Sequence, residues 1–139
     1  MNMESNIRSN AELVRSVARE TLGVSADYDE AGVRWLDQYI DGQREAASQE
    51  LKERLPSTLG SYLGECVRLT YGGQWVQDPE QGWSVKINEK LSVYPFNKVR
   101  KQLASAEGES VLGFFKAIAA LRGGRPAPVV PRRPWWRFW

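Results

Sequence analysis

The sequence predicts an α+β fold, in which helices pack on a small three-stranded antiparallel meander and an extended C-terminal tail follows. Apolar residues recur every three to four positions in the first half of the chain, as in amphipathic helices. The period changes to two between Trp75 and Val93, as in strands with one buried face. Glycine, proline, arginine and tryptophan then dominate from Gly123 onward. The 139 residues therefore divide most simply into one domain, residues 1–122, and a separate tail, residues 123–139.

Two helices are predicted before residue 55. The first covers about residues 6–22, with an apolar stripe made of Leu13, Val14, Val17, Ala18 and Thr21. The second begins at Asp27, because aspartate accepts a backbone N–H at a helix start and Glu30 follows three positions later, as in a capping box. Its aromatic-rich face consists of Tyr28, Trp35, Leu36, Tyr39 and Ile40. Gly42 kinks or ends this helix, and residues 43–54 extend it into solvent.

A third helix is predicted from Pro56, since proline suits the first helical position. Its apolar repeat consists of Leu59, Tyr62, Leu63, Cys66, Val67 and Thr70. Gly60 and Gly64 each cost about 1 kcal/mol in a helix interior relative to alanine, and close approach to another helix would offset that cost. Gly72-Gly73 ends the helix.

The second half of the domain predicts three short strands followed by two helices. The strands are expected near residues 74–77, 82–88 and 91–94, with turns between them. One helix follows from Pro95 to about Leu103, and the last runs from Glu109 to Leu121. The inward-facing residues of these two helices are Val99, Leu103, Val111, Phe114, Phe115 and Ile118.

The net charge of +2 hides an asymmetry along the chain. No acidic residue follows Glu109, whereas six basic residues do, so residues 1–109 carry more acidic than basic groups. A mildly acidic body argues against nucleic acid as a partner. The basic end favours an acidic partner or anionic lipid.

The residue inventory excludes several chemistries. No histidine is present, which removes Ser-His-Asp and Cys-His catalysis and histidine zinc ligands. Cys66 is the only cysteine and cannot form an internal disulfide, which fits a reducing compartment. The start of the chain lacks the basic and apolar regions of a signal peptide, and no apolar run approaches the ~20 residues that span a bilayer. We therefore expect a cytoplasmic protein with no cofactor and no metal.

Three short motifs resemble those of a group of small uncharacterised bacterial domains. The motifs are Gly60-Ser61-Tyr62-Leu63-Gly64-Glu65-Cys66, Tyr71-Gly72-Gly73-Gln74-Trp75 and Tyr94-Pro95-Phe96-Asn97-Lys98-Val99. Some comparable small proteins resemble immunity proteins, which neutralise toxins delivered between bacteria. The resemblance covers about residues 24–121 and implies no catalytic residues.

Glu65 and Trp75 are the candidate binding residues inside the domain. Helical geometry places Glu65 roughly 130° from the centre of the apolar stripe. At such a boundary it pairs with a lysine or arginine of this chain, binds the cation of a partner, or, as a third alternative, acts as a general acid or base. Trp75 is expected to face Trp83 across the first turn, as a core pair or as part of a groove that accepts a peptide.

Two other groups are interpreted as structural. Cys66 lies on the apolar stripe, so its thiol is predicted to be buried and unreactive. Asp37 and Asp41 lie four positions apart and share a helix face, where they are solvated or, as the alternative, bind a metal.

The chain ends in the sequence PRRPWWRFW, and exposed tryptophan and arginine anchor many interfaces. Prolines before it favour extended backbone, so the tail is expected to stand off the domain as a semi-rigid stalk. Its candidate partner-binding residues are Arg132, Arg133, Trp135, Trp136, Arg137, Phe138 and Trp139. A protein partner, an anionic membrane surface and fold-back onto the domain are the three alternatives.

These features favour a non-enzymatic cytoplasmic interaction protein whose tail binds a protein partner, with an immunity role as one option. One alternative is a peripheral membrane-surface protein anchored by the tail. Another is a hydrolase that uses a pair of carboxylates. The sequence identifies neither the partner nor the oligomeric state.

Overall fold

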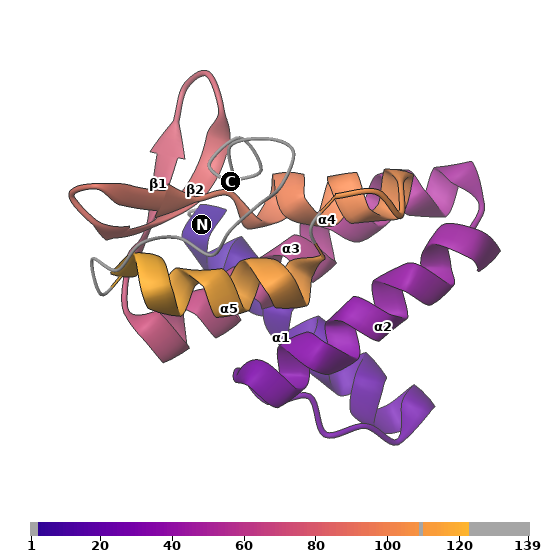
Figure 1. The fold of residues 1–139 in the computed structure, drawn as a ribbon. Helices are drawn as coiled ribbons and strands as arrows, with labels where there is room; N and C mark the ends of the chain where they lie inside the picture. Colours follow the sequence, from indigo (N-terminus) through magenta and orange to yellow (C-terminus); the bar gives the residue numbers. More distant parts are fainter. Residues whose placement is uncertain (1–2, 109, 123–139) are drawn as a thin grey trace.

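The computed structural model describes residues 3–108 and 110–122. In this part of the chain, five helices accompany a three-stranded antiparallel sheet, which confirms the predicted α+β class (Figure 1). The helices are α1 (Met3–Leu22), α2 (Glu30–Ala46), α3 (Gln49–Tyr71), α4 (Pro95–Ala104) and α5 (Val111–Arg122). The strands are β1 (Gln74–Asp78), β2 (Gly82–Asn88) and β3 (Leu91–Val93). The predicted tail, residues 123–139, lies outside the described residues.

Helix α3 is the centre of the fold, and all four other helices contact it (Figure 1). Every residue from Leu59 to Val67 is buried, including the polar ones. Two glycines make this dense packing possible. A Cβ atom at Gly60 would overlap Phe96 of α4, and one at Gly64 would overlap the Trp75 ring of β1. The predicted close approach is confirmed, although at Gly64 the neighbour belongs to a strand.

The start of α2 differs from the prediction. The helix is capped by Asp29, whose Oδ1 accepts the backbone N–H of Gly32 at 2.9 Å. Asp27 has tertiary contacts instead: its carbonyl accepts the Tyr62 hydroxyl, and its carboxylate pairs with Arg15 at 3.2 Å. The prediction that Asp27 caps this helix is therefore wrong, because these contacts hold Asp27 outside the helix.

The boundary between α2 and α3 also differs from the prediction. Helix α2 continues through Gly42, and Ser48 caps α3 by accepting the N–H of Leu51 at 3.1 Å. Residues 43–54 therefore belong to two helices rather than to one extension. Pro56 lies inside α3 rather than at its first position.

The sheet agrees closely with the prediction. The strand order is β1-β2-β3, with Trp75 opposite Val85 and Gln77 opposite Trp83. The sheet lies at one side of the helices, where β2 contacts α3 (Figure 1). Its buried residues Trp75, Val85 and Val93 join the helical core.

Helices α4 and α5 bury the six residues predicted to face inward. Helix α5 begins at Val111, and the Ser110 hydroxyl accepts the N–H of Gly113 at 3.2 Å. Thr21 and Thr70, predicted to lie on apolar stripes, are exposed. None of the helices in the described residues is both long and apolar enough to cross a membrane.

Candidate functional site

A buried polar cluster ties α3 to β1. The Glu65 carboxylate accepts two hydrogen bonds from Arg68, at 2.7 and 3.0 Å, and one from the Trp75 indole Nε1 at 2.9 Å. Only 4% of Glu65 and 6% of Trp75 is exposed. The predicted pairing of Glu65 with a basic residue is confirmed. Its predicted boundary position is wrong, because Trp75 covers that side of α3.

The contacts of Glu65 decide its protonation state. Burial raises its pKa, but the hydrogen bonds from Arg68 and Trp75 and the positive charge of Arg68 together outweigh burial, so the pKa is lowered. The carboxylate is therefore ionised at neutral pH, whereas a general acid needs a raised pKa. Glu65 has the chemistry of a fixed anion that positions Trp75. Partner binding by these two residues stays a prediction, since here they bind each other.

Trp75 also belongs to an aromatic cluster beside the sheet. Its ring meets Trp83 edge-on, with centroids 6.4 Å apart, and lies 5.8 Å from the Phe96 ring. The predicted contact between Trp75 and Trp83 is confirmed, but it is diagonal because Trp83 pairs with Gln77. Trp83 and Phe96 line a hollow of about 280 Å³ whose remaining lining is largely polar.

Asp37 and Asp41 hold α4 against α2. The side-chain amide of Gln102 donates to the Asp37 carboxylate at 2.6 Å and to the Asp41 carboxylate at 3.0 Å. Its carbonyl oxygen accepts the N–H of Val111 at 2.8 Å, which adds the start of α5 to the network. Both carboxylates therefore have a structural partner. Across the described residues, no group of three or more acidic or cysteine side chains is placed to hold a metal ion.

Cys66 is fully buried in the core, as predicted. Burial raises the pKa of its thiol, which keeps the sulfur protonated and unreactive at neutral pH.

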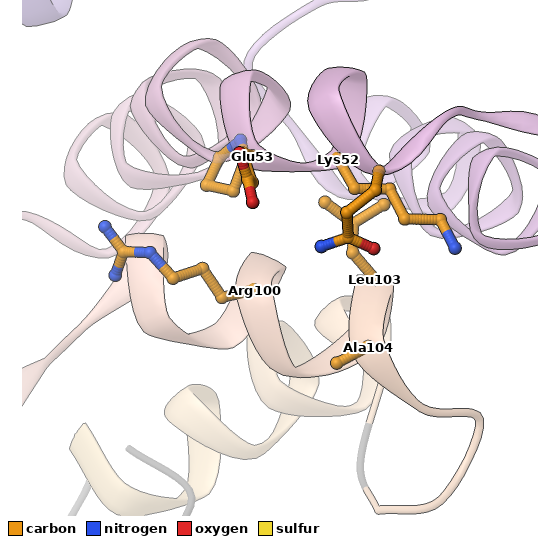
Figure 2. A pocket seen from close by; sticks show the side chains of 7 residues that line it. Lys52, Glu53, Arg100, Leu103 and Ala104 are labelled. Atoms are coloured by element: carbon orange, nitrogen blue, oxygen red, sulfur yellow. The ribbon is translucent and has the colours of Figure 1, made fainter.

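A hollow of about 400 Å³ separates the first turns of α3 from α4 (Figure 2). Glu53 points from α3 towards α4, while Lys52 and Arg100 extend towards opposite sides of the hollow (Figure 2). Arg100 donates to Asn97 one turn earlier on α4, at 2.6 Å. Charges of both signs thus surround this hollow, and they give it no single-sign field that would select a charged ligand.

A second kind of surface lies where α1, α2 and α3 meet. We call it the apolar groove. It has a volume of about 150 Å³ and is lined by Leu13, Val14, Val17, Leu22, Trp35, Tyr39, Leu55, Thr58 and Leu59. The Trp35 and Tyr39 rings stack there at 5.3 Å. Leu13, Val17 and Leu22 remain 52%, 43% and 48% exposed. The groove therefore presents aliphatic and aromatic groups to solvent in one concave place.

Leu13 and Val17 were predicted to lie on the apolar stripe of the first helix, and both remain exposed. Helix α1 buries Val14 and Ala18 of the predicted stripe, together with Ile7 and Ala11. Both alanines are fully buried, and α1 packs against α3. The width of the predicted apolar stripe could have indicated this exposure, because one contact face cannot bury a stripe that wide.

The other predicted binding residues lie outside the described residues. They are Arg132, Arg133, Trp135, Trp136, Arg137, Phe138 and Trp139, and their roles stay predictions. Comparison with family models, with curated proteins and with solved structures finds no match for this chain. The resemblance to small bacterial domains and immunity proteins therefore also stays a prediction.

Proposed function

We propose that this chain is a non-enzymatic interaction protein whose apolar groove binds an apolar segment of a partner protein. The observation that carries the proposal is the concave cluster of half-exposed Leu13, Val17 and Leu22 beside the stacked Trp35 and Tyr39. Interfaces concentrate their binding energy where an anchor side chain fills such an apolar, partly aromatic pocket. As part of the same proposal, the protein acts in the cytoplasm, where the Cys66 thiol stays reduced.

The groove offers enough apolar surface for reversible binding. Full burial of a leucine or valine side chain is worth about 1.5–3 kcal/mol, so covering three half-exposed ones gives roughly 3 kcal/mol. An aromatic group of the partner that contacts Trp35 and Tyr39 adds about 1 kcal/mol. The remaining affinity must come from contacts outside the groove, among which the predicted tail is a second candidate surface.

The hydrolase alternative has less support. Glu65 has a lowered pKa, and Asp37 and Asp41 bind the same Gln102 amide. Glu65 is enclosed by Arg68 and Trp75, and Asp37 and Asp41 share one partner on one helix face, so neither arrangement places two carboxylates on opposite sides of a substrate.

The experiment uses the full chain as bait in an extract of its own cells. The groove variant carries Leu13→Gln and Val17→Gln, which remove apolar surface without adding charge. The control variant carries Leu69→Gln and Val76→Gln, whose native side chains are 52% and 39% exposed but lie outside the groove. A captured protein is then purified, and its Kd is measured for each bait.

The groove variant loses about 2 kcal/mol of binding free energy, so its Kd is expected to rise about 30-fold, whereas the control variant keeps the native Kd. Equal Kd values for the two variants would contradict the proposal. Sedimentation with anionic vesicles tests the membrane alternative. Vesicle binding that is unchanged in the groove variant and that weakens as salt is added would favour anchoring by the tail.

A further inference from the structure

We propose that the aromatic end of this chain, residues 135–139, docks into the apolar groove of the same molecule. This inference rests on the proposed function, because it names the occupant of the groove when the partner is absent. The inference is based on two features. One is the groove lined by apolar groups, and the other is the C-terminal sequence, in which four of the last five residues are aromatic.

The size of the groove suits one aromatic side chain. An apolar cavity of 150 Å³ in another protein takes up a single benzene molecule, and the groove has a similar volume of about 150 Å³. The Trp35 and Tyr39 rings provide an aromatic wall, against which a further ring can stack or meet edge-on. A helix of a partner would need a longer groove, with anchors spaced over several turns. One tryptophan from an extended segment fits the volume better.

The place where the chain leaves α5 allows this contact. Arg122, at the end of α5, donates to the carbonyl of Tyr71 at 3.3 Å, so α5 ends beside the C-terminal end of α3. The groove meets α3 at Thr58, 13 residues earlier, which is about 20 Å along the helix axis. Residues 123–135 span up to about 40 Å when extended. The segment is therefore long enough to reach the groove and to pass around the side chains between.

The same geometry favours occupation of the groove by the tail of the same molecule over occupation by the tail of a second copy. A short tether gives its end an effective concentration in the millimolar range at a site within reach. A second copy must reach that concentration in solution to compete. Charge adds a smaller contribution. Glu20, one turn after Val17 on α1, forms no ion pair within the described residues, and the tail carries four arginines.

A docked tail would cover the apolar surface that the proposed partner binds. A partner must displace the tail before it binds, and a partner that captured the tail would open the groove. Removing the tail's aromatic side chains is therefore expected to increase capture of a partner that binds the groove.

The test is a double-mutant cycle on the full chain, read by thermal unfolding. The tail variant carries Trp135→Ala, Trp136→Ala, Phe138→Ala and Trp139→Ala. It is made in the native chain, in the Leu13→Gln, Val17→Gln background, and in the Leu69→Gln, Val76→Gln control background. All changed domain positions are exposed, and circular dichroism checks that each protein is folded.

The tail variant is expected to lower Tm by about 4 °C in the native and control backgrounds, and not to lower it in the groove background. The same shift in all three backgrounds, or no shift in any, would overturn the inference. A shift that grows with protein concentration would overturn it in favour of exchange between copies. The cycle is independent of any partner. If the groove variant fails to capture the partner but the tail and groove substitutions show no coupling in Tm, this inference is overturned and the proposed function still holds.

Discussion

Replacing Glu65 by glutamine tests whether the polar cluster holds β1 on α3. The glutamine side chain keeps an acceptor for the Trp75 indole but loses the charge that accepts two hydrogen bonds from Arg68. Hydrogen bonds to charged groups contribute about 1.5–3 kcal/mol, and Arg68, whose side chain is 24% exposed, recovers part of that by turning to water. We expect Glu65→Gln to lower the free energy of unfolding by about 2 kcal/mol at pH 7.

A second pair on the same helix provides the control. Glu50 and Arg54 are 2.9 Å apart, but their side chains are about three-quarters exposed. Glu50→Gln should therefore change stability by less than about 0.5 kcal/mol. Urea unfolding followed by tryptophan fluorescence measures both. Equal losses in the two variants would refute the argument that burial gives the Glu65 cluster its strength.

The pH dependence of the same variants has a definite sign. Because the folded-state pKa of Glu65 is lowered, its ionised form contributes stability that is fully present above the unfolded pKa, about 4.5. That contribution is lost as the pH falls through the folded-state pKa. The stability difference between the native chain and Glu65→Gln should narrow steadily below about pH 4.5. A difference that stays constant down to strongly acidic pH would contradict the lowered pKa.

Four further substitutions and one labelling experiment test the packing and the capping. Gly64→Ala should destabilise by about 1–3 kcal/mol, because its Cβ overlaps Trp75, whereas Gly42→Ala, which faces open space in α2, should stabilise by about 0.5–1 kcal/mol in the same urea assay. Asp29→Ala should cost about 1 kcal/mol and Asp27→Ala less, since only Asp29 caps α2; the reverse order in thermal unfolding would contradict the assignment. Cys66 should react with a thiol reagent only at the rate of unfolding, and rapid native-state labelling would disprove its burial.

Local signals predicted the sheet and the last two helices well. One turn, from Asp78 to Gly82, joins β1 to β2, and a second turn after Asn88 joins β2 to β3. In both turns, a side chain of the turn itself accepts a backbone N–H two residues later. The apolar stripes of α4 and α5 likewise match one buried face each.

The helix boundaries depended on tertiary contacts that local signals do not contain. Asp27 and Asp29 both have the chemistry of a cap, and the contact of Tyr62 with the Asp27 carbonyl separates them. Around Ser48 the neighbouring residues all favour helix, so the break could not be located by propensity.

The candidate sites were harder to predict for the same reason. Glu65 would be exposed if α3 had one buried face, but α3 is covered on all sides between Leu59 and Val67. The apolar groove depends on which flank α1 turns towards α3. Helix α1 buries Ala11 and Ala18 completely and leaves the larger Leu13 and Val17 exposed, although apolar periodicity places Leu13, Val17 and Ala18 on one stripe.

The most direct test of the proposed function uses the full-length tail variant, in which the aromatic side chains that would cover the groove are removed, and follows its methyl NMR signals as the purified partner is added. The methyl groups of Leu13, Val17 and Leu22 are expected to shift and to become protected from a soluble paramagnetic probe. Those of Leu69 and Val76 should remain unchanged, because they are similarly exposed but lie outside the groove. Shifts at Leu69 or Val76 with none at Leu13 and Val17 would show that the partner binds elsewhere and would contradict binding in the groove.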